Sequence, residues 1–216
     1  MYTITTSQMN AIDQNCKYFG LSTLQLMENA GSGIANEVRK LIGSGTIVVI
    51  AGKGNNGGDA FVAARHLASN GNYTIKIILL GHSDRIKTDD AKRNYQVLKH
   101  CGIRNIQEIS DSRQLSGLDW IDNADVIIDA ILGTGVKNKI RVPESTAIDL
   151  INNSNAKVVS VDVPSGLDPD GGAFEKSVIS DVTLTFHRMK PGLQSKEINR
   201  YTKGIKVVDI GVCSDA

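Results

Sequence analysis

A segment rich in glycine and asparagine, residues 51–59 (AGKGNNGGD), lies between two apolar runs. The run before it, 46–50, has the composition of a buried strand, and the run after it, 60–64, is typical of a helix. A loop that joins a strand to a helix in this way presents backbone N–H groups at the helix N-terminus, where they attract phosphate. Glycine lets the main chain approach such a ligand with no Cβ in the way. Because the loop also has the G-x-G-x-x-G spacing, it predicts a nucleotide site.

Three more segments of unusual composition follow apolar runs further along the chain. They are 129–135 (DAILGTG), 161–169 (VDVPSGLDP) and 185–192 (TFHRMKPG). Each of them alone could be ordinary turn chemistry, because Gly, Pro, Asn and Asp dominate turns. Ligands of open parallel sheets bind beyond the carboxyl ends of the strands. Four such segments at one edge of a sheet therefore indicate a shared site.

Two carboxylates in these segments need a partner if they are buried. Asp129 and Asp162 each end an apolar run, and a buried charge is costly unless it is paired. A hard cation held by oxygen atoms would supply that partner, with the Asn56 amide and the Ser165 hydroxyl as co-ligands. Because such a site offers neutral oxygens and few carboxylates, a weakly charged ion such as K⁺ fits it better than zinc.

Other residues in these segments allow two interpretations each. The segment 133–135 (GTG) is either a second anion-binding turn or a simple strand-to-loop turn. Asp59 would fall in the first turn of a helix that starts near Gly58, where it could bind a ligand or merely cap the helix. Lys190 could anchor a phosphate, or act as an acid/base if burial favours its neutral form, or simply be solvated.

The elements that must position these residues alternate along the chain. Strand-length apolar segments are expected at 46–51, 73–80, 105–109, 125–130, 157–162, 182–186 and 205–210. Helices are expected at about 7–18, after the capping-box sequence at Ser22, from Gly58 to Gly71, from Thr88 to Gly102, and from Pro143 to Asn153. Continuous Val/Ile/Leu runs suit strands that are covered on both faces. The alternation predicts a doubly wound α/β fold.

The overall composition argues against several other classes. The 216 residues suffice for one large domain or two small ones, with 41% hydrophobic and 22% charged residues, as in soluble globular proteins. A net charge of +1 does not indicate nucleic acid or a membrane as partner. Cys16, Cys101 and Cys213 lack metal-binding spacing and are expected as reduced thiols. With no secretory signal and no apolar run of about 18 residues, the protein is expected in the cytoplasm.

A ribose-binding carboxylate is missing from the second apolar run. A dehydrogenase of the usual Rossmann type has an acidic residue at the end of its second strand, about 20 residues beyond the glycine pattern. Here that strand would end in residues 79–82 (LLGH), so a nucleotide is not expected in the usual pose. The chain also has no G-x-S-x-G or H-E-x-x-H motif, which leaves serine hydrolases and zinc proteases without support.

The order and spacing of these segments resemble one known family, the NAD(P)H-hydrate epimerases, also called YjeF N-terminal domain proteins. The matching blocks are LMENAG at 26–31, GKGNNGGD at 52–59, DAILGTG at 129–135, DVPSG at 162–166, and TLTF at 183–186 followed by Lys190 and Gly192. They extend over nearly the whole chain. Departures are slight: Val163 stands where isoleucine is common, and Leu132 where an aromatic residue is frequent.

The resemblance implies a fold and a reaction. The fold would be a single domain over 1–216, a Rossmann-like three-layer α/β/α sandwich with a mostly parallel central sheet and a helical N-terminal extension, usually forming a homodimer. The reaction would interconvert the R and S forms of NADHX and NADPHX, which carry a hydroxyl on C6 of the reduced nicotinamide ring. A dehydratase that uses ATP or ADP then restores NAD(P)H from the S form. The chain has no room for that domain, so a stand-alone epimerase or an excised domain is expected.

The resemblance also assigns roles by position. Asn56, Asp129 and Ser165 would bind one K⁺ per subunit, in agreement with the oxygen ligands inferred above. The residues that would hold the substrate are Asn55, Asn56, Gly57, Gly58, Asp59, Gly133, Thr134, Gly135, Val136, Lys137, Asn138, Lys139 and Asp162.

The chemistry of the hydrated ring suggests a mechanism. Because C6 lies next to the ring nitrogen, the nitrogen lone pair can expel the hydroxyl once an acid protonates it, and water can add to the opposite face. Asp162 is the best candidate acid/base, since burial at a strand end can favour its protonated form, and Lys190 is a second candidate. The rival assignments are a nicotinamide oxidoreductase and a non-catalytic binding module. The second would be expected to lose site residues, which are all present here.

Overall fold

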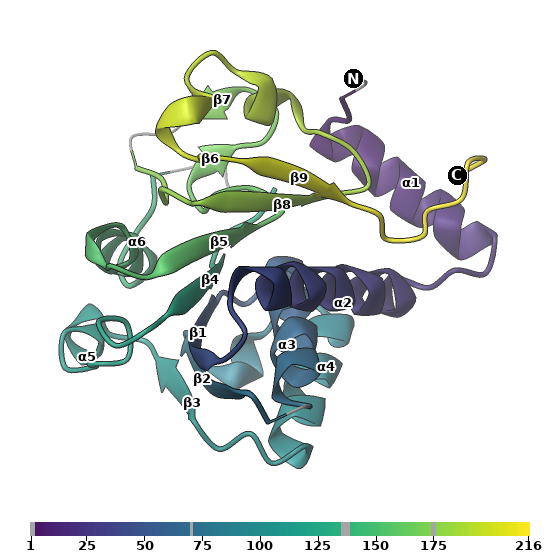
Figure 1. Ribbon diagram of the computed structural model, residues 1–216. Helices are drawn as coiled ribbons and strands as arrows, with labels where there is room; N and C mark the ends of the chain where they lie inside the picture. The colour runs from purple at the N-terminus through teal and green to yellow at the C-terminus, as the bar shows by residue number, and fades with distance from the viewer. Residues whose placement is uncertain (1–2, 70, 135–138, 174–175) are drawn as a thin grey trace.

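A seven-stranded sheet forms the centre of the molecule (Figure 1). The computed structural model describes residues 3–69, 71–134, 139–173 and 176–216. The strands run in the order β3-β2-β1-β4-β5-β8-β9, and every neighbouring pair is parallel. Their bounds are β1 Gly45–Ala51, β2 Tyr73–Leu80, β3 Ile106–Ile109, β4 Val126–Ala130, β5 Lys157–Val161, β8 Val182–Phe186 and β9 Ile205–Val208. All seven expected strands are confirmed, with ends shifted by at most two residues.

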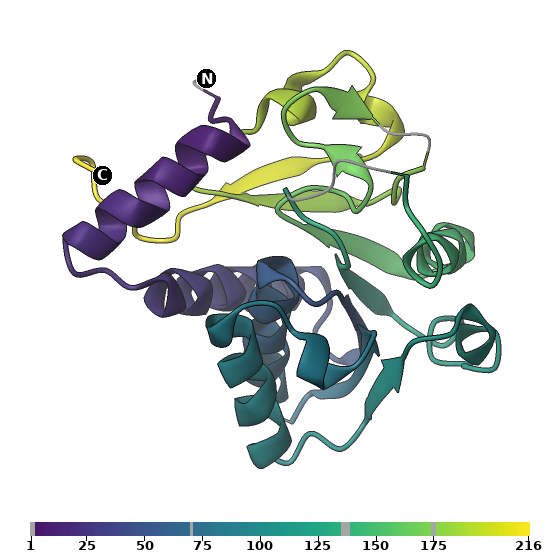
Figure 2. The same ribbon diagram turned by 180° about the vertical axis from the view of Figure 1, so that it is seen from behind.

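Helices cover both faces of this sheet. Their bounds are α2 Thr23–Leu41, α3 Asn55–Ala68, α4 Asp89–His100, α5 Ser112–Leu115 and α6 Glu144–Asn153. In Figures 1 and 2, α2, α3 and α4 lie on one face, and α5 and α6 lie on the other. Within β1, Ile47 and Val49 pack into the first core, while Val48 and Ile50 pack into the second. Burial on both faces explains the continuous apolar runs, and the three-layer sandwich is confirmed.

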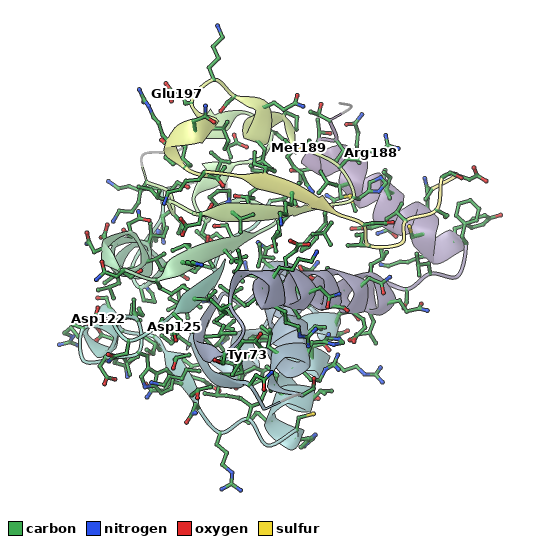
Figure 3. All side chains as sticks on the ribbon, in the orientation of Figure 1. Tyr73, Asp122, Asp125, Arg188, Met189 and Glu197 are labelled. Carbon is green, nitrogen blue, oxygen red and sulfur yellow. The ribbon has the colours of Figure 1, made fainter. Side chains whose placement is uncertain are left out.

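One helix lies outside the three layers. α1 (Thr6–Tyr18) crosses the end of the sheet beside the C-terminal segment (Figure 2). A parallel bridge joins Thr3 to Met189, and the Ile4 amide donates to the Met189 carbonyl at 2.8 Å. Figure 3 shows Met189 and its neighbour Arg188 beside this helix. The expected helical extension is therefore confirmed, and it is anchored on the segment that follows β8.

Several short elements were not predicted. α5 is a single turn, and η1 (Ser83–Arg85), η2 (Pro191–Gln194) and η3 (Ile198–Arg200) are short 3-10 helices. β6 (Leu167–Asp168) and β7 (Gly172–Ala173) form a separate antiparallel pair. Elements of two to four residues are too short to show a hydrophobic period. Within the described ranges, no helix has the length and apolar character needed to span a membrane.

The start of α3 differs from its prediction. The helix begins at Asn55, not near Gly58, and Gly54 is its N-cap residue. Asp59 is therefore the fifth helical residue, beyond the first turn, and its interpretation as a cap is wrong. No side chain caps this helix, so the sequence offered no capping signature at the true boundary. Within the described part of the chain, the N-cap residue of α3 thus offers no side-chain acceptor to the first-turn amides.

Candidate active site

A buried ion pair joins the ends of β5 and β8. Asp162 directly follows β5, and its Oδ1 lies 2.6 Å from Nζ of Lys190. The same oxygen accepts hydrogen bonds from Thr185 Oγ1 at 3.1 Å and from the Phe186 amide at 3.2 Å. Lys190 is 0% exposed and also donates to the Phe186 carbonyl at 2.9 Å. The interpretation of Lys190 as a solvated lysine is therefore wrong.

The backbone of Asp162 orients its carboxylate. Its φ of 63° is in the left-handed region, which non-glycine residues rarely adopt. Strained backbone of this kind persists where the surroundings fix it, and it clusters at functional sites. All three donors contact Oδ1, so Oδ2 has no donor among the described residues. The second oxygen is thus available to a ligand.

This ion pair lines a cavity of about 150 Å³ beneath α1. Three more carboxyl groups line the same cavity: Asp13 from α1, Asp59 from α3 and Asp90 from α4. Asp59 is 8% exposed, and no hydrogen bond or ion pair joins its carboxyl to another described residue. Burial raises the pKa of Asp59 well above its usual value, and the charges of Asp162 and Asp13 raise it further. Burial likewise raises the pKa of Asp13, against an opposing effect of Lys17.

A second cavity of about 340 Å³ adjoins the first. It is lined by the glycine loop, by Lys53 and Lys87, and by Gly133 and Thr134. The open amides at the start of α3 belong to this loop, so partial positive charge of the helix adds to that of two lysines. Lys53 donates to the Leu80 carbonyl at 3.1 Å, and its Nζ lies 3.6 Å from Oε1 of Glu144, which lines the same cavity. This cavity has the groups that bind phosphate.

Three predicted residues connect the two cavities. Asn55, Asn56 and Thr134 line both of them. The two spaces therefore form one elongated site along the carboxyl edge of β1, β4 and β5. One end holds several carboxyl groups around Lys190, and the other holds Lys53 and Lys87 together with Glu144.

The glycines of the loop serve close packing. A Cβ on Gly52 would lie 1.9 Å from the Ile131 carbonyl oxygen, and one on Gly57 would lie 2.1 Å from the Gly52 carbonyl oxygen. A Cβ on Gly58 would lie 2.6 Å from the sulfur of Met27. Gly57 and Gly58 are buried and are not among the residues that line the two cavities. Packing therefore explains both glycines, and their contact with substrate stays a prediction.

The predicted K⁺ ligands converge between β4 and β5. Asn56 Nδ2 donates to the Val161 carbonyl at 2.9 Å and to the Leu132 carbonyl at 3.3 Å. The Ser165 hydroxyl also contacts the Leu132 carbonyl, at 3.2 Å. Gly133 packs closely on the same amide, because a Cβ there would lie 2.5 Å from Asn56 Oδ1. The Ser165 hydroxyl and the Leu132 carbonyl thus lie together, and the Asn56 amide turns its Nδ2 toward them.

The buried Asp129 carboxylate accepts hydrogen bonds from protein groups. It is 0% exposed and accepts hydrogen bonds from Ser160 Oγ at 2.8 Å, from the Ser165 amide at 2.9 Å and from the Ser165 hydroxyl. Burial raises the pKa of Asp129, and these hydrogen bonds oppose that shift. Protein donors therefore supply the partner that its burial requires, and a cation at this point stays a prediction. Among the described residues, no group of three or more His, Cys, Asp or Glu side chains could hold a metal.

Some predicted residues fall outside this description. Gly135, Val136, Lys137 and Asn138 lie outside the described residues. Lys139 directly follows them and is not one of the residues that line the two cavities.

The sequence analysis did not single out Asp13. Met9, Ile12 and Cys16 recur at helical spacing around it, and Asp13 is the only carboxylate before residue 28. A lone carboxylate beside the apolar face of an expected helix was the signal that could have pointed to Asp13 as a site residue.

Comparison with known proteins decides the family. The model of the family described as "YjeF-related protein N-terminus" matches residues 23–192. The chain belongs to this family. The resemblance inferred from the sequence is thereby confirmed.

Relatives extend the similarity over the full chain. An NAD(P)H-hydrate epimerase of Cenarchaeum symbiosum is 39% identical over 215 residues, which cover 99% of this chain and 97% of that protein. The bifunctional NAD(P)H-hydrate repair enzyme Nnr of Archaeoglobus fulgidus is 45% identical over 97% of this chain, which spans only 41% of that enzyme. The crystal structure of the yeast protein ynu0 superposes with a TM-score of 0.78 at 26% identity, covering 94% of this chain and 86% of that one.

Proposed function

We propose that this family member is an isomerase that interconverts the R and S forms of NADHX and NADPHX. The observation that carries this proposal is the oriented Asp162 carboxylate, whose free Oδ2 lies in a cavity that adjoins a phosphate-binding one. Relatives of matching length are named NAD(P)H-hydrate epimerase, which supports the same reaction.

The elongated site matches the shape of a nicotinamide nucleotide. The hydrated nicotinamide ring would occupy the cavity with Asp162, and the pyrophosphate would lie in the cavity with Lys53 and Lys87. In this orientation the phosphates meet the N-terminus of α3, while the reacting carbon meets the carboxylate. Asn55 and Asn56 would contact the substrate between these two ends.

Lys190 is better suited to position Asp162 than to bind phosphate. Its ammonium is fully buried and already contacts Asp162 and the Phe186 carbonyl. It holds Oδ1 and thereby points Oδ2 toward the ring. Asp162 then accepts a proton from the water that adds to C6 of the iminium form of the ring.

A K⁺ ion fits the oxygen atoms between β4 and β5. Asn56, Ser165 and Asp129 would hold it together with the Leu132 carbonyl. When bound, it would supply positive charge at the strand ends near the substrate. Neutral oxygens dominate this set, as suits a monovalent ion.

Potassium should therefore stabilise the folded protein. An ion at about 100 times its Kd adds about 2.7 kcal/mol, or roughly 5–10 °C in Tm for a domain of this size. Thermal unfolding in KCl and in choline chloride at equal ionic strength measures this difference. Ser165→Ala should remove most of it. An equal Tm in both salts would contradict the site.

The activity can be tested in a coupled assay. R-NADHX is mixed with an S-specific dehydratase and its ATP or ADP, and NADH formation is followed with and without this protein. We expect the protein to make consumption of the R form many times faster than spontaneous epimerisation. Consumption at the spontaneous rate would reject the proposal, and NAD(P)H oxidation with carbonyl substrates would favour an oxidoreductase instead.

The wider setting follows from the relatives. The chain spans about two fifths of the bifunctional enzymes that it matches, so we propose that it works beside an NAD(P)H-hydrate dehydratase in the cytoplasm. A homodimer is proposed from the family resemblance, and light scattering after gel filtration would test it.

A further inference from the structure

The proposed reaction needs a proton donor as well as a base. The hydroxyl on C6 leaves easily only if it is protonated as the C–O bond breaks. Oδ1 of Asp162 accepts a hydrogen bond from Nζ of Lys190 at 2.6 Å, and the role given to Asp162 above is that of the proton acceptor. A second group in the same cavity must therefore carry the proton.

Few side chains in the cavity can donate one. Besides Asp162 and Lys190, the titratable groups that line it are Asp13, Asp59 and Asp90. Asp90, in the first turn of α4, already accepts a hydrogen bond from Thr23 Oγ1. Asp13 and Asp59 have no ion pair or hydrogen bond of their side chains within the described residues.

The charges in the cavity favour protonation of these two groups. Four carboxyl groups line the cavity with one cation, Lys190, which is paired with Asp162. Carboxylates close to one another do not all ionise, because like charges raise the cost of each additional charge. In line with this, the pKa values of Asp13 and Asp59 are raised, first by burial and then by neighbouring carboxylates. Within one site, a carboxyl group that has no cationic partner is suited to be the acid, and one that is paired with a cation is suited to be the base.

Asp13 is the better donor of the two because of its position. It belongs to α1, whereas Asp162 belongs to the strand ends that α1 crosses. α1 is fixed on the Lys190 segment by Met189, and the Thr6 amide donates to Asp170 at 2.8 Å. Asp13 is only partly buried, so water can restore its proton, while Asp59 is almost enclosed at 8% exposure.

We propose that Asp13 is the general acid that protonates the departing C6 hydroxyl, while Asp162 takes the proton of the water that returns. This assignment rests on the proposed epimerase function. The C6–O bond breaks with its electron pair going to oxygen, and the proton of Asp13 converts that oxygen to water. The ring nitrogen lone pair forms C=N⁺. Water then forms the new C6–O bond on the other face and loses its proton to Asp162, and solvent returns both groups to their starting states.

Asp13 should impose an alkaline limit on the rate. A general acid works only in its protonated form, so kcat falls as the pH rises past its pKa in the complex. The charged groups that face Asp13 are Lys17 on its own helix, Asp162 and Lys190 at the strand ends, and Asp59 on α3. Removing the carboxyl should therefore abolish this fall in kcat at alkaline pH, the alkaline limb of the pH profile.

The test compares Asp13→Asn, Asp13→Glu, Asp59→Asn and the exposed-site control Asp119→Asn in the coupled assay. We expect Asp13→Asn to lower kcat by about 10²–10⁴-fold with KM changed less than about threefold, and to lose the alkaline limb. Asp13→Glu should recover part of the rate, and Asp119→Asn should behave as the wild type. Incorporation of ¹⁸O from labelled water at C6 should fall in parallel with kcat.

The outcomes separate this inference from the function on which it rests. If the wild-type protein does not accelerate epimerisation, the proposed function fails. If the wild type is active and folded Asp13→Asn keeps its rate within threefold and its alkaline limb, Asp13 is not the acid. Loss of that limb in Asp59→Asn alone would assign the proton to Asp59 and overturn the proposal.

Discussion

Asp162→Asn should lower kcat for R-NADHX by about 10²–10⁴-fold, the usual contribution of a positioned acid or base. The amide keeps the shape of the carboxylate but accepts no proton from the incoming water. Phosphate contacts at the far end of the site are unchanged, so KM should stay close to that of the wild type. The coupled assay with excess dehydratase measures both constants.

This substitution also leaves Lys190 buried without its anion. Breaking a buried pair by removing one partner costs about 3–5 kcal/mol, so Asp162→Asn should also unfold more easily. Asp162→Asn combined with Lys190→Met removes both charges and should recover much of the stability without the activity. If the folded single variant keeps more than a tenth of wild-type kcat, Asp162 is not the base.

Gly52→Ala should lower the free energy of unfolding by about 3 kcal/mol or more, the upper range for overpacking. Its Cβ would lie 1.9 Å from the backbone carbonyl oxygen of Ile131. Because a Cβ and a backbone oxygen are both fixed by the main chain, no side-chain rotation can relieve this clash. The glycine loop and the end of β4 would have to separate. Urea unfolding followed by circular dichroism measures the change.

Gly54→Ala is the matched control, two residues further along the same loop. A Cβ there meets nothing within 4 Å, and φ is −101°, which alanine adopts readily. Its free energy of unfolding should lie within about 1 kcal/mol of the wild type. Equal stability of the two variants would show that the loop can move away from Ile131, against the packing described above.

The central strands were predictable because they are apolar on both faces. A run such as 47–51 (IVVIA) is continuously apolar, and its length is that of a strand rather than of a helix. The start of α3 was not predictable, because a helix without a side-chain cap has no local signature at its first residue. The β6–β7 pair is fixed by contacts between loops, which a two-residue pattern does not carry.

The sequence was enough to predict at which edge of the sheet the site lies, but not which of its side chains pair with one another. The sequence placed Asp162 and Lys190 at the same edge of the sheet, since strand order in this fold brings their loops together. It could not show that the lysine is buried against the carboxylate, because 28 residues separate them and only the tertiary structure joins them. The hydrogen bonds to Asp129 could not be predicted for the same reason, because Ser160 and Ser165 reach its carboxylate only in the tertiary structure.

The contact between Gly133 and Asn56 has a consequence for how this family can vary in sequence. A Cβ at position 133 would lie 2.5 Å from the amide oxygen of Asn56, so a larger residue at 133 is not accommodated while Asn56 keeps its place. Relatives that carry a larger residue at 133 should carry a smaller one at 56, and the double exchange should be tolerated where the single exchange at 133 is not. These two positions, 77 residues apart in the chain, are therefore expected to be inherited as a pair.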